Sequence, residues 1–335
     1  MALARLAAGA ALFAAAALLP SARATRQAQL VLDTHVHITN TSLLTYPWAN
    51  ASLGVPCPAA PPALCNWTLS DYAAATVSTP AAKVVFVEVA VASAEWLAEA
   101  SWVQSLAAAP GGAQLGAIVA QPPPGFGVPG ADAAKVAAGL DALAALPLAR
   151  GVRGSGINFS DAAALPTAIA HTRLLAARRL SLDVITAVQA PGAAAGILAL
   201  ARAVPEATLV LDHVGSPDVA ADLAPWAAAM AALGAQPNIF VKVGGIFQYY
   251  KSTQAVPTLA QVAPIATAAI RAFGFGRAVH ECNWFFVNWL SPPHLDMCAL
   301  WHTYLASVLD GMAATRDERD DLFWRAGARA YRVAM

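Results

Sequence analysis

Eight apolar runs rich in β-branched residues recur along this chain, separated by stretches of helical length. The runs span 29–38, 83–91, 114–121, 149–154, 181–187, 207–214, 238–246 and 277–284. Near-continuous apolar runs predict parallel strands covered on both faces. Ala/Leu-rich stretches lie between or after them, at 94–109, 131–146, 161–180, 191–203, 218–233, 258–273, 295–312 and 316–331. Eight β units alternating with eight α units in about 300 residues is typical of a (β/α)8 barrel.

An open, doubly wound sheet is the alternative arrangement of such units. No glycine-rich phosphate-binding pattern follows the first run, which disfavours it. We therefore predict one TIM-barrel domain over residues 25–335. Three residues with capping oxygens stand near the starts of predicted helices, and we expect Asp161, Asp218 and Thr258 to cap them.

The N-terminal segment has the three parts of a secretory signal peptide. Arg5 supplies positive charge, residues 6–19 form an apolar core that is short for a bilayer span, and Pro20 ends it. The Ala-Arg-Ala tripeptide at 22–24 fits the cleavage pattern, so residues 1–24 are predicted to be removed on secretion or entry into the secretory lumen. An uncleaved N-terminal anchor is the alternative.

Secretion changes how the cysteines and the longest loop are interpreted. Cys57 and Cys65 bracket a Pro-rich stretch that they can close as a disulfide, whereas Cys282 and Cys298 have no clear assignment. The loop 40–66 follows the first strand, where barrel active sites lie, so it is expected to cover the site. Four N-x-S/T sequons predict glycosylation, at Asn40, Asn50, Asn66 and Asn158.

The charge balance narrows the class of partner. The chain has 20 Lys and Arg, 20 Asp and Glu, and a formal net charge of +0. A neutral chain of low charge density argues against nucleic acid and anionic membrane surfaces as partners. We expect a small-molecule substrate, and no membrane association after signal cleavage.

Two histidines end the first run, in the sequence Asp33-Thr34-His35-Val36-His37. Side chains alternate along a strand, so both imidazoles project to one side together with Asp33. Such a pair can bind one metal ion or one substrate oxygen. An incidental pair of core histidines is the alternative.

Each later run carries or is followed by a polar residue near its carboxyl end: Glu88, Gln121, Arg153, Asp183, His213, Lys242 and Asn283. Because polar groups are costly to bury without partners, their placement at one rim of a barrel predicts a site. The planar guanidinium of Arg153 suits a substrate carboxylate, and a structural pair with Glu88 or Asp183 is its alternative role. Alternation points Glu281 inward with Asn283 and His280 toward the helices.

Three motifs together resemble the amidohydrolase-related (amidohydrolase type 2) family, over about residues 30–333. They are Asp-x-His-x-His in the first run, Asp-His-x-Gly-x-Pro from Asp212 to Pro217, and the last run with its following Leu300-Trp301 helix. The segment 322–332 is similar to the closing helix of that family. The resemblance implies a TIM-barrel hydrolase, lactonase or decarboxylase, closest to the lactonase-like branch.

The chain departs from the family pattern at two strands. Where the resemblance implies an aspartate on the eighth strand and a histidine on the fifth, this chain has Asn283 and Asp183. An amide cannot act as a general base, although an asparagine here resembles the lactonase branch. Whether the site uses a divalent metal, zinc or manganese, or none stays open. Phe285-Phe286 replaces an expected proline and predicts an aromatic pocket mouth.

We predict a hydrolase that opens a lactone or a similar cyclic ester. The predicted catalytic residues are His213, Asn283 and Asp183. The predicted substrate-binding residues are Arg153, Lys242, Glu88 and Gln121. The predicted metal ligands are His35, His37 and His213. A metal-dependent decarboxylase on the same fold, and a barrel that has lost catalysis and binds a ligand, are the alternatives.

Overall fold

The structure is a computed structural model that describes residues 29–52, 66–253, 256–289 and 296–335. It contains one eight-stranded sheet in which each strand pairs in parallel with the next along the chain. The strands are β1 Leu32–Val36, β2 Lys83–Val87, β3 Leu115–Ala120, β4 Ala149–Arg153, β5 Ser181–Val184, β6 Leu209–Leu211, β7 Ile239–Val243 and β8 Ala278–His280. Each lies within a predicted run, because buried parallel strands carry apolar residues on both faces.

The first and last strands meet and close the sheet. A parallel bridge joins Val36 to Trp284, and the amide of Asn283 donates to the carbonyl oxygen of His35 at 3.0 Å. The hydroxyl of Thr34 donates to the carbonyl oxygen of His280 at 2.7 Å. The fold is therefore the predicted (β/α)8 barrel.

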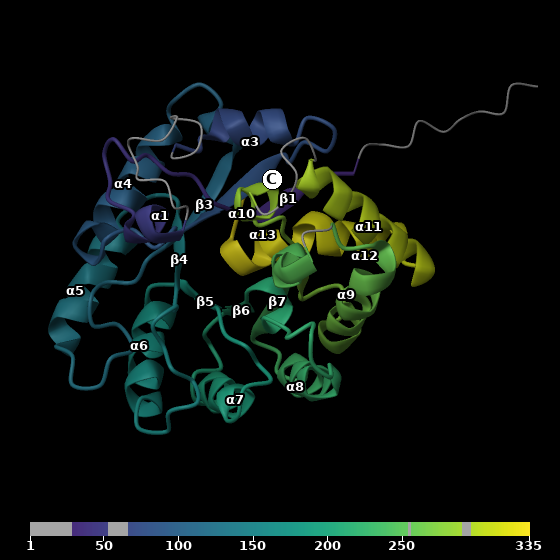
Figure 1. The fold of residues 1–335 in the computed structure, drawn as a ribbon. Helices are drawn as coiled ribbons and strands as arrows, with labels where there is room; N and C mark the ends of the chain where they lie inside the picture. Colours follow the sequence, from purple (N-terminus) through teal and green to yellow (C-terminus); the bar gives the residue numbers. More distant parts are fainter. Residues whose placement is uncertain (1–28, 53–65, 254–255, 290–295) are drawn as a thin grey trace, which may run out of the picture.

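Helices surround the barrel between successive strands (Figure 1). The main ones are α4 Trp96–Leu106, α5 Ala133–Ala144, α6 Leu165–Ala177, α7 Ala193–Ala203, α8 Ala224–Gly234, α9 Leu259–Phe273 and α11 Met297–Gly311. The chain closes with α12 Arg316–Asp320, a π-helical turn Asp321–Arg325 and α13 Ala326–Tyr331. Shorter helices are α1 Pro47–Ser52, α3 Leu69–Ala75 and α10 Phe286–Trp289. No helix of the described residues has the length and apolar character needed to cross a bilayer.

The three expected helix caps have different outcomes. Thr258 forms a capping box with Gln261 at the start of α9, as predicted. Asp161 and Asp218 instead accept hydrogen bonds from the amides of Ala163 and Ala220, in turns that precede α6 and α8. The prediction was wrong for these two because an aspartate favours a turn as readily as a cap.

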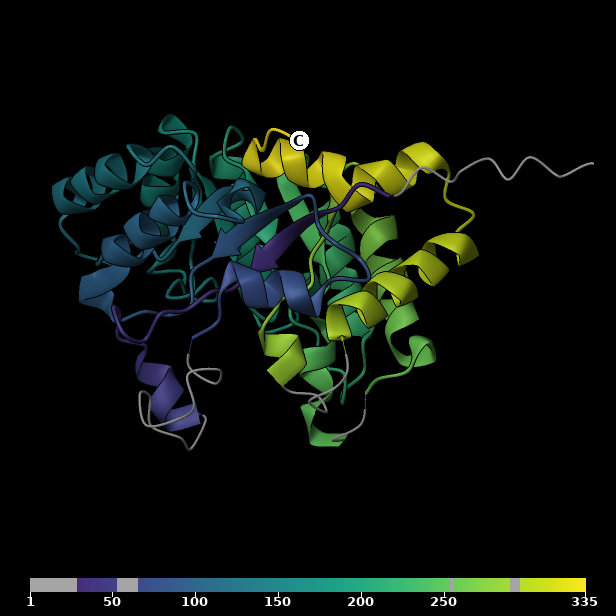
Figure 2. The ribbon, with the colours of Figure 1, turned by 90° about the horizontal axis from the view of Figure 1, so that it is seen from above.

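The two ends of the barrel are covered by different elements. Figure 2 shows the end of the chain and the yellow helices beside it on one side, and α1 on the opposite side. Tyr331 of α13 packs inside the barrel with Leu32, Val85 and Val210, and so fills its N-terminal end. The C-terminal strand ends face α1 and α10, which is the side where the predicted site lies.

One disulfide supports the C-terminal end. Cys282, just after β8, is bonded to Cys298 of α11, a pairing that the sequence left unassigned. Cys57 and Cys65 lie outside the described residues.

Candidate functional site

His35 of β1 and His37, just after that strand, meet at their ring nitrogens. The Nε2 atoms of His35 and His37 are 3.2 Å apart, and both side chains are buried. His37 Nδ1 donates to the carbonyl oxygen of Val87 at 2.9 Å, which leaves its Nε2 with a free lone pair. Burial, reinforced by Arg153, lowers the pKa of His37 to about 3, so this imidazole is neutral and able to bind a cation.

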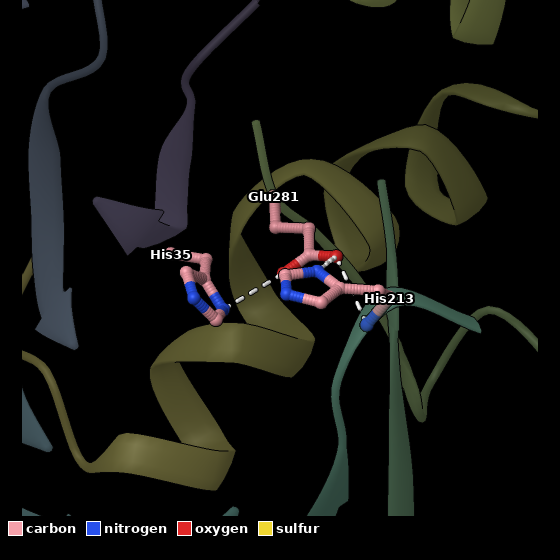
Figure 3. A group of neighbouring side chains, drawn as sticks. All are labelled: His35, His213 and Glu281. Atoms are coloured by element: carbon pink, nitrogen blue, oxygen red, sulfur yellow. Dashed lines mark hydrogen bonds and ion pairs between the residues drawn. The ribbon is translucent and has the colours of Figure 1, made fainter. Parts of the chain in front are cut away.

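The carboxylate of Glu281, directly after β8, joins His35 to His213. Glu281 Oε1 accepts from His213 Nδ1 at 2.8 Å, and its Oε2 lies 3.0 Å from His35 Nδ1 (Figure 3). Burial raises the pKa of Glu281, but His213 and His35 outweigh it and bring the value to about 2. The ligand atoms of the three residues lie within 4.8 Å of one another. An ionised carboxylate thus holds two imidazoles in place, and its inward direction is the one predicted from strand parity.

Two glycines after β7 make room for this group. A Cβ at Gly245 would lie 2.4 Å from His213 Nδ1, and one at Gly244 would lie 2.0 Å from the carbonyl oxygen of Glu281. Gly245 also has a φ of 62°, in the left-handed region. Only glycine allows the backbone to approach His213 and Glu281 this closely.

Lys242 of β7 is the centre of a second buried group. Its Nζ lies 2.6 Å from Asp183 Oδ2 and 2.8 Å from Asp212 Oδ1, and the hydroxyl of Tyr331 donates to Asp183 at 2.7 Å. Burial alone would lower the pKa of Lys242, but the two aspartates raise it. Neither Lys242 nor Asp183 is among the described residues that line the cavity at this end of the barrel. The structure thus brings the two together beneath the histidines, with Nζ 3.1 Å from His35 Nδ1.

Arg153 of β4 lines the same cavity as His37 and His213. Its Nε donates to Glu88 Oε1 at 2.6 Å, and its Nη2 donates to the carbonyl oxygen of Glu88 at 2.9 Å. The structural pair considered from the sequence is therefore present, and yet Arg153 still lines the cavity. Glu88 fixes the guanidinium plane, while Gln121 directly follows β3 and is not one of the described lining residues.

Asn283 occupies the position where the resemblance implies an aspartate. Its side chain lines the cavity, and its buried Oδ1 has no hydrogen-bond partner among the described residues. Its φ of 67° is left-handed, a conformation that asparagine tolerates. The amide therefore presents a free acceptor to whatever enters the cavity.

The cavity itself has a volume of about 270 Å³. It is lined by His37, Trp48, Val89, Ala90, Arg153, Ile185, His213, Gln248, Asn283 and Phe286. Trp48 comes from α1, within the loop expected to cover the site, and its Nε1 donates to the carbonyl oxygen of Val89 at 2.5 Å. The ring of Phe286 lies 6.0 Å from that of Trp48, so the expected aromatic mouth is confirmed.

Sequence reasoning missed several members of this site. Glu281 was expected to point inward but received no role, and Trp48 and Gln248 were not singled out. The inward parity of Glu281 was the one available signal. His280 faces outward as expected, with its ring 5.4 Å from that of Phe323.

Comparison with known proteins places this geometry in a family. The sequence profile of the amidohydrolase family matches residues 32–333. A zinc-bound amidohydrolase from Burkholderia multivorans superposes with a TM-score of 0.70 at 20% identity, covering 91% of this chain and 100% of that one. A putative 2-pyrone-4,6-dicarboxylic acid hydrolase from Pseudomonas putida has a TM-score of 0.58 at 18% identity, covering 92% and 100%.

A curated relative, the L-fucono-1,5-lactonase of Burkholderia ambifaria, is 32% identical over 89 residues. That match covers 26% of this chain and only 30% of the lactonase. The family assignment therefore rests on the profile match over nearly the whole barrel and not on this short alignment. The chain belongs to the amidohydrolase family.

Proposed function

We propose that this protein is a hydrolase that opens a lactone or a similar cyclic ester. One observation carries the proposal: His37, His213, Arg153 and Asn283 line a single small cavity with apolar and aromatic walls. Such a cavity excludes bulk water from the scissile bond while polar groups converge on one part of it. The names of the hydrolase and lactonase relatives are consistent with this chemistry.

The residues fit a divalent cation. The 3.2 Å between the Nε2 atoms of His35 and His37 matches the separation of about 3.3 Å between two ligands of a tetrahedral zinc ion. The two buried groups contain one lysine, Lys242, and three carboxylates, those of Asp183, Asp212 and Glu281. Negative charge is therefore in excess in these groups when the histidines are neutral. We assign Nε2 of His35, His37 and His213 as ligands of zinc or manganese, held from behind by Glu281. When bound, the ion supplies Lewis acidity that polarises a substrate carbonyl.

The chain also contains an imidazole–carboxylate pair that can move a proton. Glu281 accepts the Nδ1 hydrogen of His213, which leaves Nε2 as the proton acceptor on a residue that lines the cavity. In a protein without a resident ion, His213 Nε2 takes a proton from water and Glu281 stabilises the imidazolium. This assignment supplies the base that Asn283 cannot provide.

Two further residues bind the substrate. Arg153, held in plane by Glu88, donates to a carboxylate or ring oxygen. Asn283 Oδ1 accepts from a substrate hydroxyl or from the attacking water. Lys242 and Asp183 do not reach the cavity, and we assign them the support of His35 rather than contact with substrate.

The first experiment is elemental analysis of the purified protein after expression with zinc and manganese, followed by a panel of sugar lactones and pyrones. We expect His213→Ala to lower kcat on a turned-over lactone by about 10²–10⁴-fold. The matched control is His302→Ala, on α11 and away from the cavity. Unchanged turnover in His213→Ala contradicts the proposed mechanism. One equivalent of metal, lost in His37→Ala, supports the ligand assignment, and a metal-free active protein supports the His213–Glu281 base.

The unpartnered Asn283 favours one rival, a barrel that binds a ligand without turning it over. Asn283→Asp restores the carboxylate that the family pattern implies and keeps a residue that tolerates the left-handed backbone. If neither the natural chain nor this variant hydrolyses any lactone, while both bind one tightly, the rival is correct. Release of carbon dioxide from an aromatic acid, in place of lactone opening, would identify a decarboxylase.

We also propose that the protein enters the secretory route. The Cys282–Cys298 disulfide supports this, because such bonds persist in oxidising compartments. N-terminal sequencing of protein from its native source should begin at Thr25. A chain that retains its first 24 residues would contradict cleavage, and a mass shift on enzymatic removal of N-glycans tests the sequons.

A further inference from the structure

A second cavity, of about 350 Å³, lies at the N-terminal end of the barrel. Four of its seven lining residues are arginines: Arg150, Arg178, Arg179 and Arg332. They come from the start of β4, the turn between α6 and β5, and the residue after α13. The histidine cavity is at the opposite, C-terminal ends of the strands, so the two cavities share no lining residue.

The guanidinium groups of Arg150 and Arg332 are held in place by backbone carbonyl oxygens. Arg150 Nη1 donates to the carbonyl oxygens of Pro147 and Ala149, each at 2.8 Å. Arg332 Nη2 donates to the carbonyl oxygen of Arg179. These bonds preorganise charged groups that otherwise lose rotamer freedom when a ligand binds.

Positive charge in this cavity is not balanced by the protein. Arg178 is paired with Asp141, at 2.8 Å, but Asp141 itself is 67% exposed. Within the described ranges, Arg150, Arg179 and Arg332 have no carboxylate within 4.0 Å, and the buried Nε of Arg150 has no hydrogen-bond partner. Burial, and then the charge of neighbouring arginines, lower the pKa values of Arg150 and Arg332.

Two of these arginines stand where glycine is usual. Arg179 and Arg332 follow the ends of α6 and α13 with left-handed φ values of 58° and 52°. The amides of Leu180 and Val333, one residue further on, donate back to the carbonyls of Leu175 and Ala328, as in the helix ending that favours glycine. The chain therefore bears local backbone strain at both positions and gains a guanidinium at each.

We propose that this arginine cavity binds the tetrahedral oxyanion of a phosphate or sulfate group. Guanidinium forks match phosphate and sulfate oxygens in pairs, and three uncompensated guanidiniums supply the opposing charge. The volume is within the range of small-molecule sites, so it accommodates either the free inorganic ion or the oxyanion end of a small monoester. The proposal is independent of the reaction at the histidine cavity.

The test is isothermal titration calorimetry of the full protein with sodium phosphate, sodium sulfate and phenyl phosphate, at constant ionic strength set with chloride. We expect saturable binding of one oxyanion per chain. Tighter binding of phenyl phosphate identifies a monoester site, and equal binding identifies a site for the free ion. No saturable binding of any of the three overturns the proposal.

Variants locate the binding. Arg179→Gly and Arg332→Gly suit the local backbone, so both should fold, and each should weaken binding at least tenfold while lactone turnover is unchanged. Arg173→Gln is the matched control, because Arg173 is an exposed arginine of α6 outside the cavity, and it should bind as the natural chain does. Undiminished binding in both glycine variants would place the oxyanion elsewhere and overturn the assignment.

Discussion

Charged side chains are paired at the C-terminal end of this barrel, whereas several are unpaired in the cavity at its N-terminal end. At the C-terminal end, Lys242 lies between Asp183 and Asp212, and Arg153 is bonded to Glu88. At the N-terminal end, the arginine cavity has three guanidiniums with no carboxylate within 4.0 Å, among the residues that the structure describes. The charged side chains at the first end are buried, where an unpaired charge is costly, whereas those at the second end are partly exposed and tolerate the lack of a partner. Pairing at the C-terminal end fixes its buried charges in place, whereas the unpaired arginines at the N-terminal end leave positive charge for the proposed oxyanion.

The largest expected effect is at the buried lysine. Lys242→Met removes the ammonium group that lies 2.6 Å from Asp183 and 2.8 Å from Asp212, and should lower the free energy of unfolding by about 3–5 kcal/mol because two buried carboxylates lose their partner. Urea denaturation followed by circular dichroism measures it. Lys135→Met, at an exposed lysine of α5, should change stability by less than about 0.5 kcal/mol. Equal effects at the two lysines would mean that the pairing at the C-terminal end does not stabilise the fold.

The next effect is on catalysis. Glu281→Gln keeps the size of the side chain but removes the charge that accepts the Nδ1 hydrogen of His213 and lies 3.0 Å from His35 Nδ1. We expect kcat or metal affinity to fall about 10–100-fold, with KM little changed. The ¹⁵N chemical shifts of His213 should show a changed tautomer, which a purely structural role would not produce. Glu206→Gln, at an exposed position, is the control.

The sequence predicts which strands and helices the fold contains better than it predicts how deep a given side chain lies in the barrel. Arg153 and Asp183 are register partners on neighbouring strands. From the sequence, Arg153 was predicted to bind substrate and Asp183 to be catalytic. Only the longer Arg153 lines the cavity, while Asp183 is bonded below it to Lys242. Strand periodicity indicates which face a residue occupies, but it does not indicate its height along the barrel axis. Alternation alone therefore did not separate the residue that lines the cavity from the one that lies beneath it.

The sequence also does not show which distant segments of the chain come together in the fold. Arg150, the pair 178–179 and Arg332 belong to three segments that the barrel closure brings together, and no local pattern predicts their meeting. Glu281 was predictable only in part. Strand alternation predicted that it points inward, but not that it meets His35 of β1 and His213, which follows β6. The apolar runs themselves were sufficient for the fold, because strand and helix periodicity are local properties.

A smaller effect tests an unpaired carboxylate. Glu99 of α4 is buried, and both of its oxygens have no hydrogen-bond partner among the described residues. Burial, and then the charge of Glu88, raise the pKa of Glu99 well above its usual value. The folded state therefore holds a proton that the unfolded chain loses, so stability decreases as pH rises above the unfolded pKa of about 4.3. Glu99→Gln should be more stable than the natural chain by about 1–2 kcal/mol at pH 8 and nearly equal at pH 4.

The smallest effect concerns the arginine cavity without a ligand. Arg332→Gly relieves a left-handed backbone and removes one of several like charges, so it should raise the free energy of unfolding by about 1 kcal/mol in chloride buffer. Arg173→Gly, inside α6, should lower it by about 1 kcal/mol, because glycine is unfavourable within a helix. With saturating phosphate the sign at residue 332 should reverse, since the natural chain gains more from binding than a variant that binds at least tenfold more weakly. Arg332 is thus expected to destabilise the free protein and to stabilise the protein with phosphate bound. At the C-terminal end of the barrel, by contrast, removing Lys242 should lower stability whether or not substrate is present.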